Sequence, residues 1–510
     1  MILILANGLD QQAHSLAQRW GGTVLTPADL SQAGWHYELP QSTGSFAVAS
    51  GRKIPVSDIT GVLTRISCIT ERDLPDISDE DRSYVAAEMH AFLTAWLDSL
   101  DCPVLNRPTA SCLCGPSDRL PSMFDDEGDG AVVVVGDRCF GAADSRQSEL
   151  ALGIARQAGV ELISVRFRNG KSVDTSLIPD LSREDAAAAV FERLTSGKRA
   201  PRHNPARKTS EPGKSLILLW GLPADGPLGR VYEELLRIGA PVRLLDQRDV
   251  LDTNVCCGQV RVRDQSFSLE EVKSVYLRFY DSTQLPHVLD SSEKARGHAA
   301  DIDLCITRWL RTTSAFVVSP LDAMSVNNSK PYQSRWIAHF GWRIPATLIA
   351  TDPDAVRAFW KRHGEVIYKS ISSIRSRVSR LTPEHDLRFD NVTACPTQFQ
   401  EFIPGIDHRV HVVGNEVFAC QVLCDADDYR YSGEREVEYL ACQLPVEIEE
   451  RCRRMSAAMG LPVSGIDLRL TPESEWVCFE VNPSPAFTAY EDMTGQPITA
   501  AVARLLLDSR

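Results

Sequence analysis

The chain of 510 residues has no apolar run that approaches the roughly 18 residues needed for a membrane-spanning helix. Its first residues, MILILANG, follow a short strand pattern and lack the basic start and the cleavage site of a secretory signal. We therefore expect a cytoplasmic protein with no membrane partner.

Basic residues are in the minority. The 54 lysine and arginine residues stand against 68 aspartate and glutamate residues, and the formal net charge is −14. A general nucleic-acid binder normally carries a surplus of positive charge. We therefore expect no nucleic-acid partner.

The 14 cysteines include no C-x-x-C pair. They are scattered through apolar segments, which is typical of reduced core residues and not of a metal framework. The closest pairs are Cys112 with Cys114 and Cys256 with Cys257. A metal or redox role for either pair is the less favoured alternative.

Strand and helix patterns alternate along the chain, and the same order occurs twice. In the second half LILLWG (216–221), GRVYEELLRIG (229–239) and PVRLLD (241–246) predict a βαβ unit of a parallel sheet. The N-terminus repeats this order with ILILANG (2–8), an amphipathic stretch to Trp20 and GTVLTP (22–27). The matched segments that follow are GVLTRIS (61–67) with SVYLRFY (274–280), VAAEMHAFLTAWLDSL (85–100) with AADIDLCITRWLRTT (299–313), PVLNRP (103–108) with FVVSPL (316–321), and VVVVGDRCFGA (132–142) with VHVVGNEVFAC (410–420). We therefore predict an α/β fold built by tandem duplication.

The two copies differ in content. The second carries a stretch from 325 to 409, rich in Lys, Arg and Gln, where the first has only a short loop. A polar, proline-containing segment without periodicity separates the copies and is typical of a linker. The predicted parts are a first copy at 1–197, a linker at 198–214, a parallel βαβ domain at 215–325 and an α+β module at 326–510.

The stretch CFEVNPSPAF (478–487) combines an acid and an amide at strand spacing. Side chains at i and i+2 of a strand point to the same side, so Glu480 and Asn482 would project together while Phe479 and Val481 face a core. For this motif alone, a solvated strand end before a turn is the alternative.

The preceding GIDLRL places Asp467 on a neighbouring strand. A hairpin with TPESEW as its turn would bring Asp467 opposite Glu480. Carboxylate and amide oxygens suit Mg²⁺, so the hairpin is a candidate divalent site.

Three more elements precede the hairpin. SVNNSKPYQ places Lys330 before a helix that ends at Phe340 and Gly341, and the strand EVIYKSI carries Lys369 into the serine- and arginine-rich SSIRSRVSR. TQFQEFIPGIDHRVHVV combines a strand-to-hinge segment with Arg409 on the next strand. Lysines for phosphates, carboxylates for Mg²⁺ and an arginine for developing charge are what a phosphoryl-transferring ligase needs.

In this order the motifs resemble the ATP-grasp ligases of the RimK/glutathione-synthetase type, over residues 215–510. The segment GIDLRLTPESEWVCFEVNPSPAFTAYEDMTGQPI is especially similar to the microviridin-type (graspetide) peptide ligases. The resemblance implies parallel βαβ pre-ATP-grasp domains and an α+β ATP-grasp module in the C-terminal half. It also implies ATP and Mg²⁺ as cofactors.

The resemblance further implies roles for individual residues. Arg409 would face the γ-phosphate or acyl phosphate, with Lys369 as the second catalytic residue. Substrate contacts are expected from Arg377 and Arg469, with solvated arginines as the alternative. The implied Mg²⁺ ligands are Asp467, Glu480 and Asn482, and the implied ATP-binding residues are Lys330, Lys369, Ser372, Arg375, Gln400, Glu401, Phe402 and Ile403, the last four lining the adenine pocket largely through their backbone.

Two alternatives concern the neighbours of Arg409. Arg409 could be a structural partner of Asp407. His408 and His411 have no partner that the sequence identifies, and we expect a structural role for both.

The first copy lacks these elements. Alignment of VELISVRFRNG (160–170) with LPVSGIDLRLTP (461–472) places Arg166, Ser176 and Ile178 opposite Asp467, Glu480 and Asn482. We therefore expect the first copy to bind no Mg-ATP and to act as an intramolecular pseudo-dimer partner, with a homodimer as a further option. Residues 215–510 alone would then keep a nucleotide site.

The predicted function is that of an ADP-forming ligase that joins a carboxylate to an amine through an acyl phosphate, on a peptide or amino-acid substrate. One alternative is an ester-forming graspetide-type macrocyclase with a hydroxyl acceptor. The other is a non-catalytic peptide- or partner-binding protein with a structural nucleotide. The sequence does not distinguish between donor and acceptor substrates.

Overall fold

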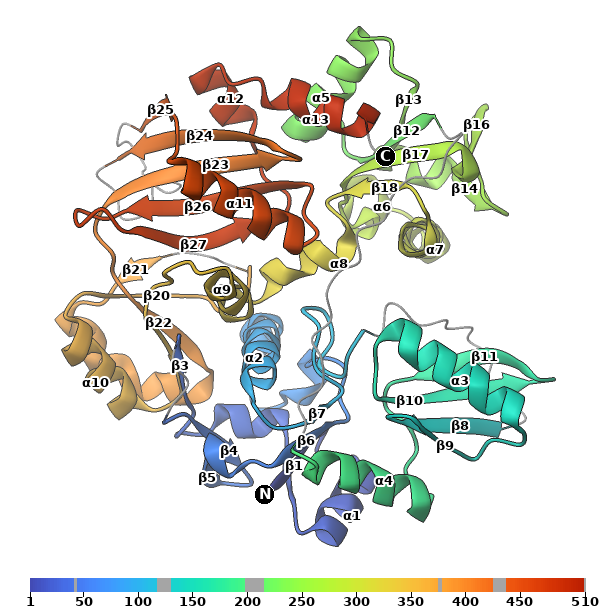
Figure 1. Cartoon of the computed structure of the whole chain (residues 1–510), viewed down its shortest axis with the longest axis vertical. Coiled ribbons are helices and arrows are strands. Elements are labelled where there is room, and N and C mark those ends of the chain that lie inside the picture. The colour runs from blue at the N-terminus through green and yellow to red at the C-terminus, as the bar shows by residue number, and fades with distance from the viewer. Residues whose placement is uncertain (41–43, 117–129, 198–214, 375–377, 425–436, 509–510) are drawn as a thin grey trace. The chain divides into compact units, whose positions relative to one another are not determined.

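The computed structural model describes residues 1–40, 44–116, 130–197, 215–374, 378–424 and 437–508 (Figure 1). The chain forms two compact units. The first unit contains Met1–His203 with Ser325–Ile403, and the second contains Asn204–Met324 with Pro404–Arg510. Part of the predicted α+β module thus belongs to the same unit as the N-terminal half. The predicted linker at 198–214 lies outside the described residues.

A four-stranded parallel sheet with the same strand order occurs in each unit. The order in both is second, first, third and fourth strand along the chain. The strands are β2 (Thr23–Leu25), β1 (Ile2–Leu5), β6 (Gly61–Thr64) and β7 (Val104–Leu105) in the first unit, and β13 (Val242–Asp246), β12 (Leu216–Gly221), β17 (Val272–Arg278) and β18 (Phe316–Val318) in the second. The predicted βαβ pattern is therefore present in both halves.

An antiparallel sheet also recurs. Its order is β11-β10-β8-β9 in the first unit and β27-β26-β23-β24-β25 in the second. The strands are β8 (Gly130–Val135), β9 (Arg138–Phe140), β10 (Leu162–Arg168) and β11 (Lys171–Ser176), against β23 (Ile406–Val413), β24 (Glu416–Leu423), β25 (Glu438–Cys442), β26 (Val463–Leu470) and β27 (Trp476–Asn482). These repeated strand orders are what a tandem duplication would produce, and the duplication itself stays a prediction.

The last large sheet joins segments that are far apart in the sequence. Its order is β21-β20-β22-β19-β3-β4-β5, and β19 pairs with β3 along Thr347 to Ala350 (Figure 1). The strands are β3 (His36–Leu39), β4 (Phe46–Ala49), β5 (Arg52–Pro55), β19 (Thr347–Ala350), β20 (Val366–Lys369), β21 (Ser379–Arg380) and β22 (Thr397–Glu401). A separate antiparallel sheet of the second unit contains β14 (Thr253–Cys256), β15 (Gln259–Val262) and β16 (Gln265–Ser268).

Helices cover these sheets, and several of them begin at polar caps. Asp10 caps α1 and Asp225 caps α5, each accepting a hydrogen bond from a backbone N–H of the first turn. The helices of the first unit are α1 (Gln11–Trp20), α2 (Asp79–Ser99), α3 (Ser145–Ala158), α4 (Glu184–Thr195), α9 (Lys330–His339) and α10 (Pro353–His363). Those of the second unit are α5 (Gly226–Arg237), α6 (Pro286–Leu289), α7 (Glu293–Thr312), α8 (Leu321–Met324), α11 (Val446–Ala458), α12 (Thr488–Thr494) and α13 (Ile498–Asp508). The 3-10 helices are η1 (Pro27–Ser31), η2 (Val56–Asp58), η3 (Glu71–Asp73), η5 (Gln247–Asp252), η6 (Leu269–Glu271), η7 (Ser282–Gln284), η8 (Ser325–Asn328) and η9 (Pro383–Ala394).

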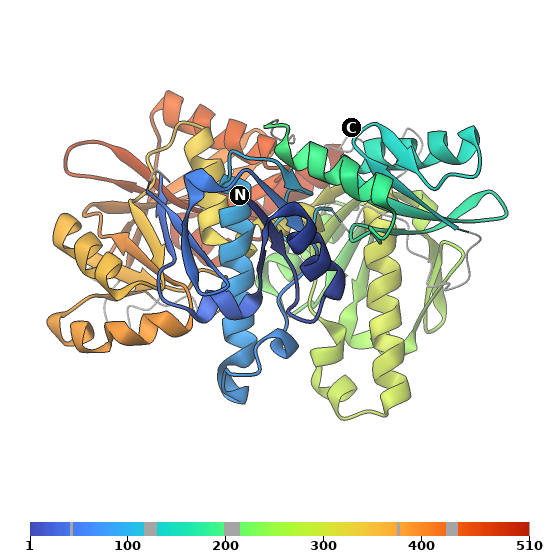
Figure 2. The same cartoon turned by 90° about the horizontal axis from the view of Figure 1, so that it is seen from below.

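Helices α2 and α7 hold equivalent places between the third and fourth strands of their parallel sheets, yet they are buried differently. On α7 the buried residues are spaced along one stripe, from Ala299 to Leu310. On α2 every residue from Ala91 to Ser99 is buried. A helix buried on all sides must pack against a second layer. Helix α9 supplies part of that layer, and it runs beside α2, which is light blue in Figure 2.

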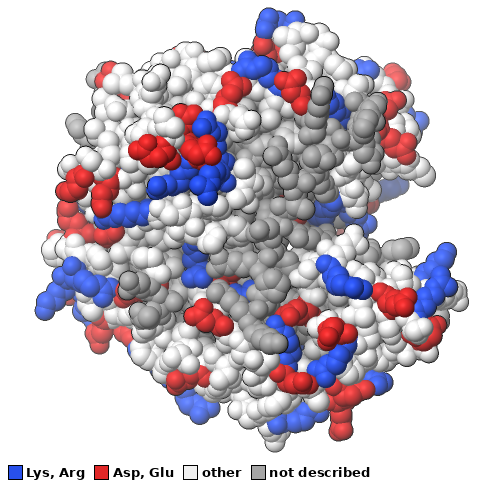
Figure 3. Space-filling model, in the orientation of Figure 1, with Lys and Arg blue, Asp and Glu red and all other residues white. Residues whose placement is uncertain are grey.

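Charged side chains are mixed on the surface. Figure 3 shows acidic and basic residues interspersed on the face it presents. One example of such pairing is Arg453 on α11, which contacts Glu449 at 2.5 Å and Glu450 at 3.0 Å. Within the described part of the chain, no helix combines the length and the apolarity needed to cross a bilayer.

Candidate active site

Two rows of side chains cross the sheet of the second unit. Strand pairing aligns Arg409 on β23 with Asp467 on β26 and Glu480 on β27. The neighbouring row aligns His411, Gly465 and Asn482. Because residues two apart on a strand face the same side, both rows lie on one face of the sheet. The predicted hairpin, with Asp467 opposite Glu480, is confirmed.

One expectation about this hairpin is wrong. Phe479 was expected to face the core, but it is only half-buried, whereas Cys478 and Val481 are fully buried. The register pairs Asp467 with Glu480 and then Leu468 with Cys478, so Phe479 is the extra residue of a β-bulge. The ring of Phe479 instead lies under the guanidinium of Arg469, at 5.1 Å from its centre.

Arg409 is buried and bound to Asp467. Its Nη1 donates to Asp467 Oδ1 at 2.6 Å, and its Nε donates to His411 Nε2 at 3.4 Å. Burial, followed by the positive charge of Arg409, holds the pKa of His411 well below its ordinary value. A neutral His411 can therefore accept this hydrogen bond, which is consistent with its expected structural role.

Asp407 has a different partner. It accepts two hydrogen bonds from Arg469, at 2.7 and 2.8 Å. The alternative in which Arg409 serves as the structural partner of Asp407 is therefore wrong, because Arg469 takes that place. The substrate role of Arg469 stays a prediction.

The turn after Asn482 is fixed by an arginine that was not among the predicted site residues. Arg278, at the end of β17, donates to Asp225 at 2.9 and 2.7 Å, to the backbone oxygens of Ser484 and Pro485 at 3.0 and 3.2 Å, and to Ser484 Oγ at 2.8 Å. The backbone N–H of Ser484 in turn donates to Asn482 Oδ1 at 2.9 Å. These bonds set the direction of the Asn482 amide.

The first unit contains an equivalent set of hydrogen bonds. Arg65, at the matched position of GVLTRIS, donates to Asp10 at 2.8 Å and to the backbone oxygen of Pro179 at 3.1 Å. Both arginines thus join the cap of the first helix to the segment after the last hairpin strand. The signal that could have found Arg278 is its recurrence with Arg65 in the matched segments.

The equivalent hairpin of the first unit corrects the sequence alignment. In this hairpin Arg166 pairs with Asp174, and a bulge follows directly after that pair, as it does after Asp467 and Glu480. Asp174, and not Ser176, therefore corresponds to Glu480, and Ser176, not Ile178, corresponds to Asn482. The turn of this hairpin is shorter, because Arg168 pairs with Lys171 whereas Leu470 pairs with Trp476, and the alignment did not account for that difference. One carboxylate is retained there, and the absence of Mg-ATP binding by this copy stays a prediction.

Lys330 and Lys369 lie in the first unit. Lys369 ends β20, as predicted, and Lys330 is the first residue of α9. Lys330 is buried, and its Nζ donates to Ser370 Oγ at 3.2 Å and to the backbone oxygen of Ser372. Ser372 is also buried. The structure thus brings Lys330 to the loop that follows Lys369.

The segment Gln400–Ile403 contains the end of β22 and the boundary between the units. The backbone N–H groups of Glu401 and Phe402 donate to the backbone oxygens of Ala346 and Glu365 at 2.9 and 3.0 Å. Gln400 Nε2 donates to Thr347 Oγ1 at 2.9 Å, while its buried Oε1 has no hydrogen-bond partner among the described residues. The predicted strand is present, and the hinge and the adenine role stay predictions.

Some predicted residues cannot be placed, and one pocket was not predicted. Arg375 and Arg377 lie outside the described residues.

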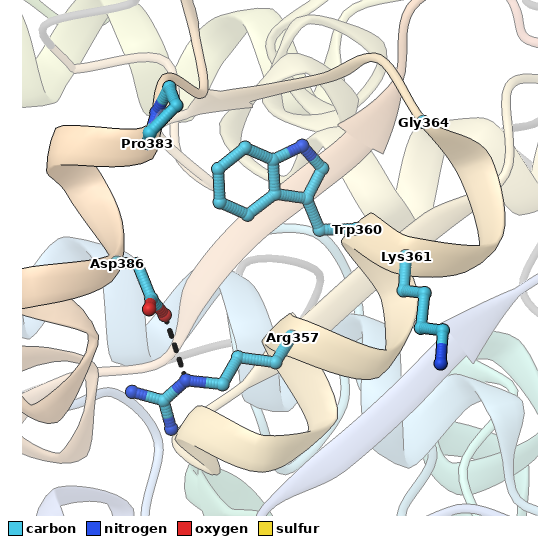
Figure 4. Close-up of a pocket in the computed structure, with 6 residues that line it drawn as sticks. All are labelled: Arg357, Trp360, Lys361, Gly364, Pro383 and Asp386. Carbon is cyan, nitrogen blue, oxygen red and sulfur yellow. Dashed lines mark hydrogen bonds and ion pairs between the residues drawn. The ribbon is translucent and has the colours of Figure 1, made fainter.

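A surface pocket of 510 Å³ is formed on α10 and η9 (Figure 4). Arg357 contacts Asp386 at 2.8 Å across it. None of the predicted site residues lines this pocket, whose lining residues are Arg357, Trp360, Lys361, Gly364, Pro383 and Asp386.

The donor set in the second unit fits a hard cation. Asp467 keeps Oδ2 beyond its bond to Arg409, and Glu480 and Asn482 add oxygens from the adjacent strand. Across the described parts of the chain, no cluster of three or more His, Cys, Asp and Glu side chains could hold a metal. Any metal bound here would therefore be coordinated by the carboxylates of Asp467 and Glu480 and the amide of Asn482.

Comparison with known proteins identifies one domain. Residues 337–506 match the family described as the RimK-like ATP-grasp domain, and no curated protein matches the chain. The chain is similar to the macrocyclase MdnC bound with precursor peptide MdnA from Microcystis aeruginosa MRC, with 24% identity and a TM-score of 0.50 over 58% of this chain and 100% of that one. It is also similar to the RiPP-associated ATP-grasp ligase of Chryseobacterium gregarium in complex with ADP and a leader and core peptide, with 22% identity and a TM-score of 0.51 over 58% of this chain and 97% of that one.

These structural likenesses concern the fold alone. The family match spans β19 to β27, and so includes Lys369, Arg409 and the hairpin of Asp467 and Glu480. The chain carries a RimK-like ATP-grasp domain over residues 337–506.

Proposed function

We propose that this protein is an ADP-forming ligase that joins a carboxylate to an amine on a peptide substrate. The observation that carries the proposal is the row of Arg409, Asp467 and Glu480 across three adjacent strands. A buried arginine beside two carboxylates provides for both a bound cation and a developing negative charge.

In the proposed reaction, a substrate carboxylate attacks the γ-phosphate of ATP and releases ADP. The resulting acyl phosphate then reacts with an amine, which displaces inorganic phosphate. Asp467, Glu480 and Asn482 would hold Mg²⁺, which when bound offsets the negative charge of the phosphates. Arg409, fixed by Asp467 and His411, would stabilise the oxyanion of the second step.

Lys369 and the hinge segment would bind the nucleotide. Lys369 leaves β20 at the start of a serine-rich loop, and Gln400–Ile403 end at one of the places where the chain passes from one unit to the other. The ammonium of Lys369 would balance phosphate charge. The groove for adenine would lie along the hinge backbone.

A ribosomal peptide is the first substrate to test. Solved ligases with this fold include proteins bound to precursor peptides. An ester-forming macrocyclase would share every step except the last, where a hydroxyl takes the place of the amine. Mass spectrometry of the product before and after mild alkaline hydrolysis separates the two, because esters are cleaved and amides are not.

The experiment that tests the function is ADP release across a panel of peptide and amino-acid carboxylates. Hydroxylamine should trap the activated donor as a hydroxamate. The non-catalytic alternative predicts nucleotide binding without ADP release under any of these conditions. Release of AMP and pyrophosphate would contradict the acyl-phosphate route.

A further inference from the structure

Glu88, in the middle of α2, holds the loop that follows Lys369. Its Oε2 accepts a hydrogen bond from the backbone N–H of Ile371 at 2.6 Å. Its Oε1 accepts from the backbone N–H and the hydroxyl of Ser372, at 2.9 and 2.5 Å. One carboxylate thus receives three hydrogen bonds from two consecutive loop residues.

Lys330 binds the same part of the loop from the other direction. Its backbone N–H donates to the carbonyl of Ile371 at 3.0 Å, and its ammonium reaches the carbonyl of Ser372 and the hydroxyl of Ser370. Glu88 therefore satisfies the donors of this loop segment, and Lys330 satisfies its acceptors. Together they fix its backbone.

The carboxylate comes from the half of the chain that lacks the predicted nucleotide residues. Helix α2 packs against α9, where Ser329 Oγ donates to the carbonyl of Ala91 at 2.6 Å and Arg335 contacts Asp98 at 3.2 Å. In the matched helix α7, the position of Glu88 is occupied by Asp301, which is exposed. Glu88 is buried because residues 325–403 cover α2.

The burial of Glu88 decides whether it holds the loop in place or blocks a phosphate position. Glu88 could in principle occupy a phosphate position and have to leave before ATP binds. However, Glu88 is 3% exposed, Ile371 0% and Ser372 3%, so these N–H groups face the protein interior. Ser373 and Ile374, directly after them, are exposed. The anchored residues thus form the base of the loop, and Ser373 and Ile374 are the exposed residues beside it that can meet a ligand.

We propose that Glu88 is a positioning residue for the nucleotide site, through which the N-terminal half orders the phosphate loop of the ATP-grasp domain. The inference rests on the proposed function, since it assumes that the loop after Lys369 binds ATP phosphates. Through Glu88, the N-terminal half would thus have a role in nucleotide binding. If so, residues 215–510 alone would bind nucleotide more weakly than the full chain.

The test uses full-length Glu88→Gln and measures two quantities. Amide hydrogen exchange should become faster at Ile371 and Ser372, whether or not nucleotide is present. The Kd for Mg-ATP should rise about tenfold, because an amide cannot accept from both loop N–H groups without placing an NH₂ against one of them. Glu80→Gln, at an exposed position on the same helix, is the matched control and should change neither quantity.

A double-mutant cycle separates positioning from loss of fold. Ser372→Ala removes one of the three hydrogen bonds, so its effect on the Kd for Mg-ATP should be smaller in the Glu88→Gln background than in wild type. Additive effects, or an unchanged Kd in Glu88→Gln with melting temperature preserved, would overturn the proposal. If wild type itself binds no Mg-ATP, the proposed function fails, while the exchange measurement still decides whether Glu88 anchors the loop.

Discussion

The guanidinium of Arg409 occupies the space in which a side chain on Gly465 would begin. A Cβ on Gly465 would lie 2.1 Å from Arg409 Nη2 and 2.6 Å from its Cζ. Gly465 stands in the row between His411 and Asn482, one row from Asp467. The absence of a side chain there lets Arg409 lie across the sheet toward the candidate metal ligands.

Gly465→Ala should therefore displace Arg409 and lower kcat for ADP release by about tenfold or more. The fold should persist, since the nearest atoms that the added methyl group would meet belong to the side chains of Arg409 and Pro485. Gly297→Ala is the control, because a Cβ at this exposed position of α7 meets nothing within 4 Å. Wild-type kcat in Gly465→Ala would show that the position of Arg409 is not needed for the reaction.

Glu480→Gln should keep the fold and abolish Mg²⁺-dependent turnover, because a neutral amide is a poor ligand for a hard cation. The measurement is ADP release at increasing Mg²⁺, together with the melting temperature. Glu473→Gln, at an exposed position in the turn of the same hairpin, should behave as wild type. Normal Mg²⁺ dependence in Glu480→Gln would remove Glu480 from the metal site.

Arg278 and Arg65 form a natural pair of variants. Arg278→Met and Arg65→Met should each lower the free energy of unfolding by about 2–4 kcal/mol, since each leaves a partly buried aspartate without its partner. Only Arg278→Met should also impair ADP release, because only Arg278 holds the turn after Asn482. Chemical denaturation and steady-state kinetics check both effects. Equal kinetic effects of the two variants would contradict this assignment.

His90 on α2 should make stability fall below neutral pH. Burial lowers the pKa of His90 from 6.5 to about 4. The unfolded chain therefore takes up the proton first as the pH falls, so the stabilisation is complete above pH 6.5 and is lost between 6.5 and about 4. On this basis wild type should lose about 2 kcal/mol more than His90→Gln between pH 7.5 and pH 5.

Urea denaturation at the two pH values measures this difference. His14→Gln, at an exposed position on α1, is the control and should keep the wild-type dependence. Identical pH dependence of wild type and His90→Gln would mean that His90 is not kept neutral by burial.

Local patterns predicted the parts of the site that lie close together in the sequence. The hairpin of Asp467 and Glu480 follows from alternation and a turn, and the strand that ends at Lys369 follows from an apolar run. The bulges were not predicted, because an extra residue leaves the alternating pattern nearly unchanged. The bulge in the second unit places Phe479 away from the core, and the shorter hairpin turn of the first unit places Asp174, not Ser176, opposite Arg166.

The pairing of β3 with β19 could not be predicted, because it joins residues about 310 positions apart without any local signal. A weaker signal did exist for Glu88. The stretch AFLTAWL on α2 is apolar on all sides, unlike its counterpart on α7, and such a helix needs a second packing partner. That partner is the segment with Lys330 and the loop after Lys369.

The transfer of ¹⁸O from a labelled substrate carboxylate tests the central claim most directly. With the first substrate that supports ADP release, an acyl-phosphate ligase moves one carboxylate oxygen to inorganic phosphate. Mass spectrometry of the phosphate should therefore find one ¹⁸O atom for each turnover in wild type, and none with Glu480→Gln. Turnover that yields unlabelled phosphate would contradict the account.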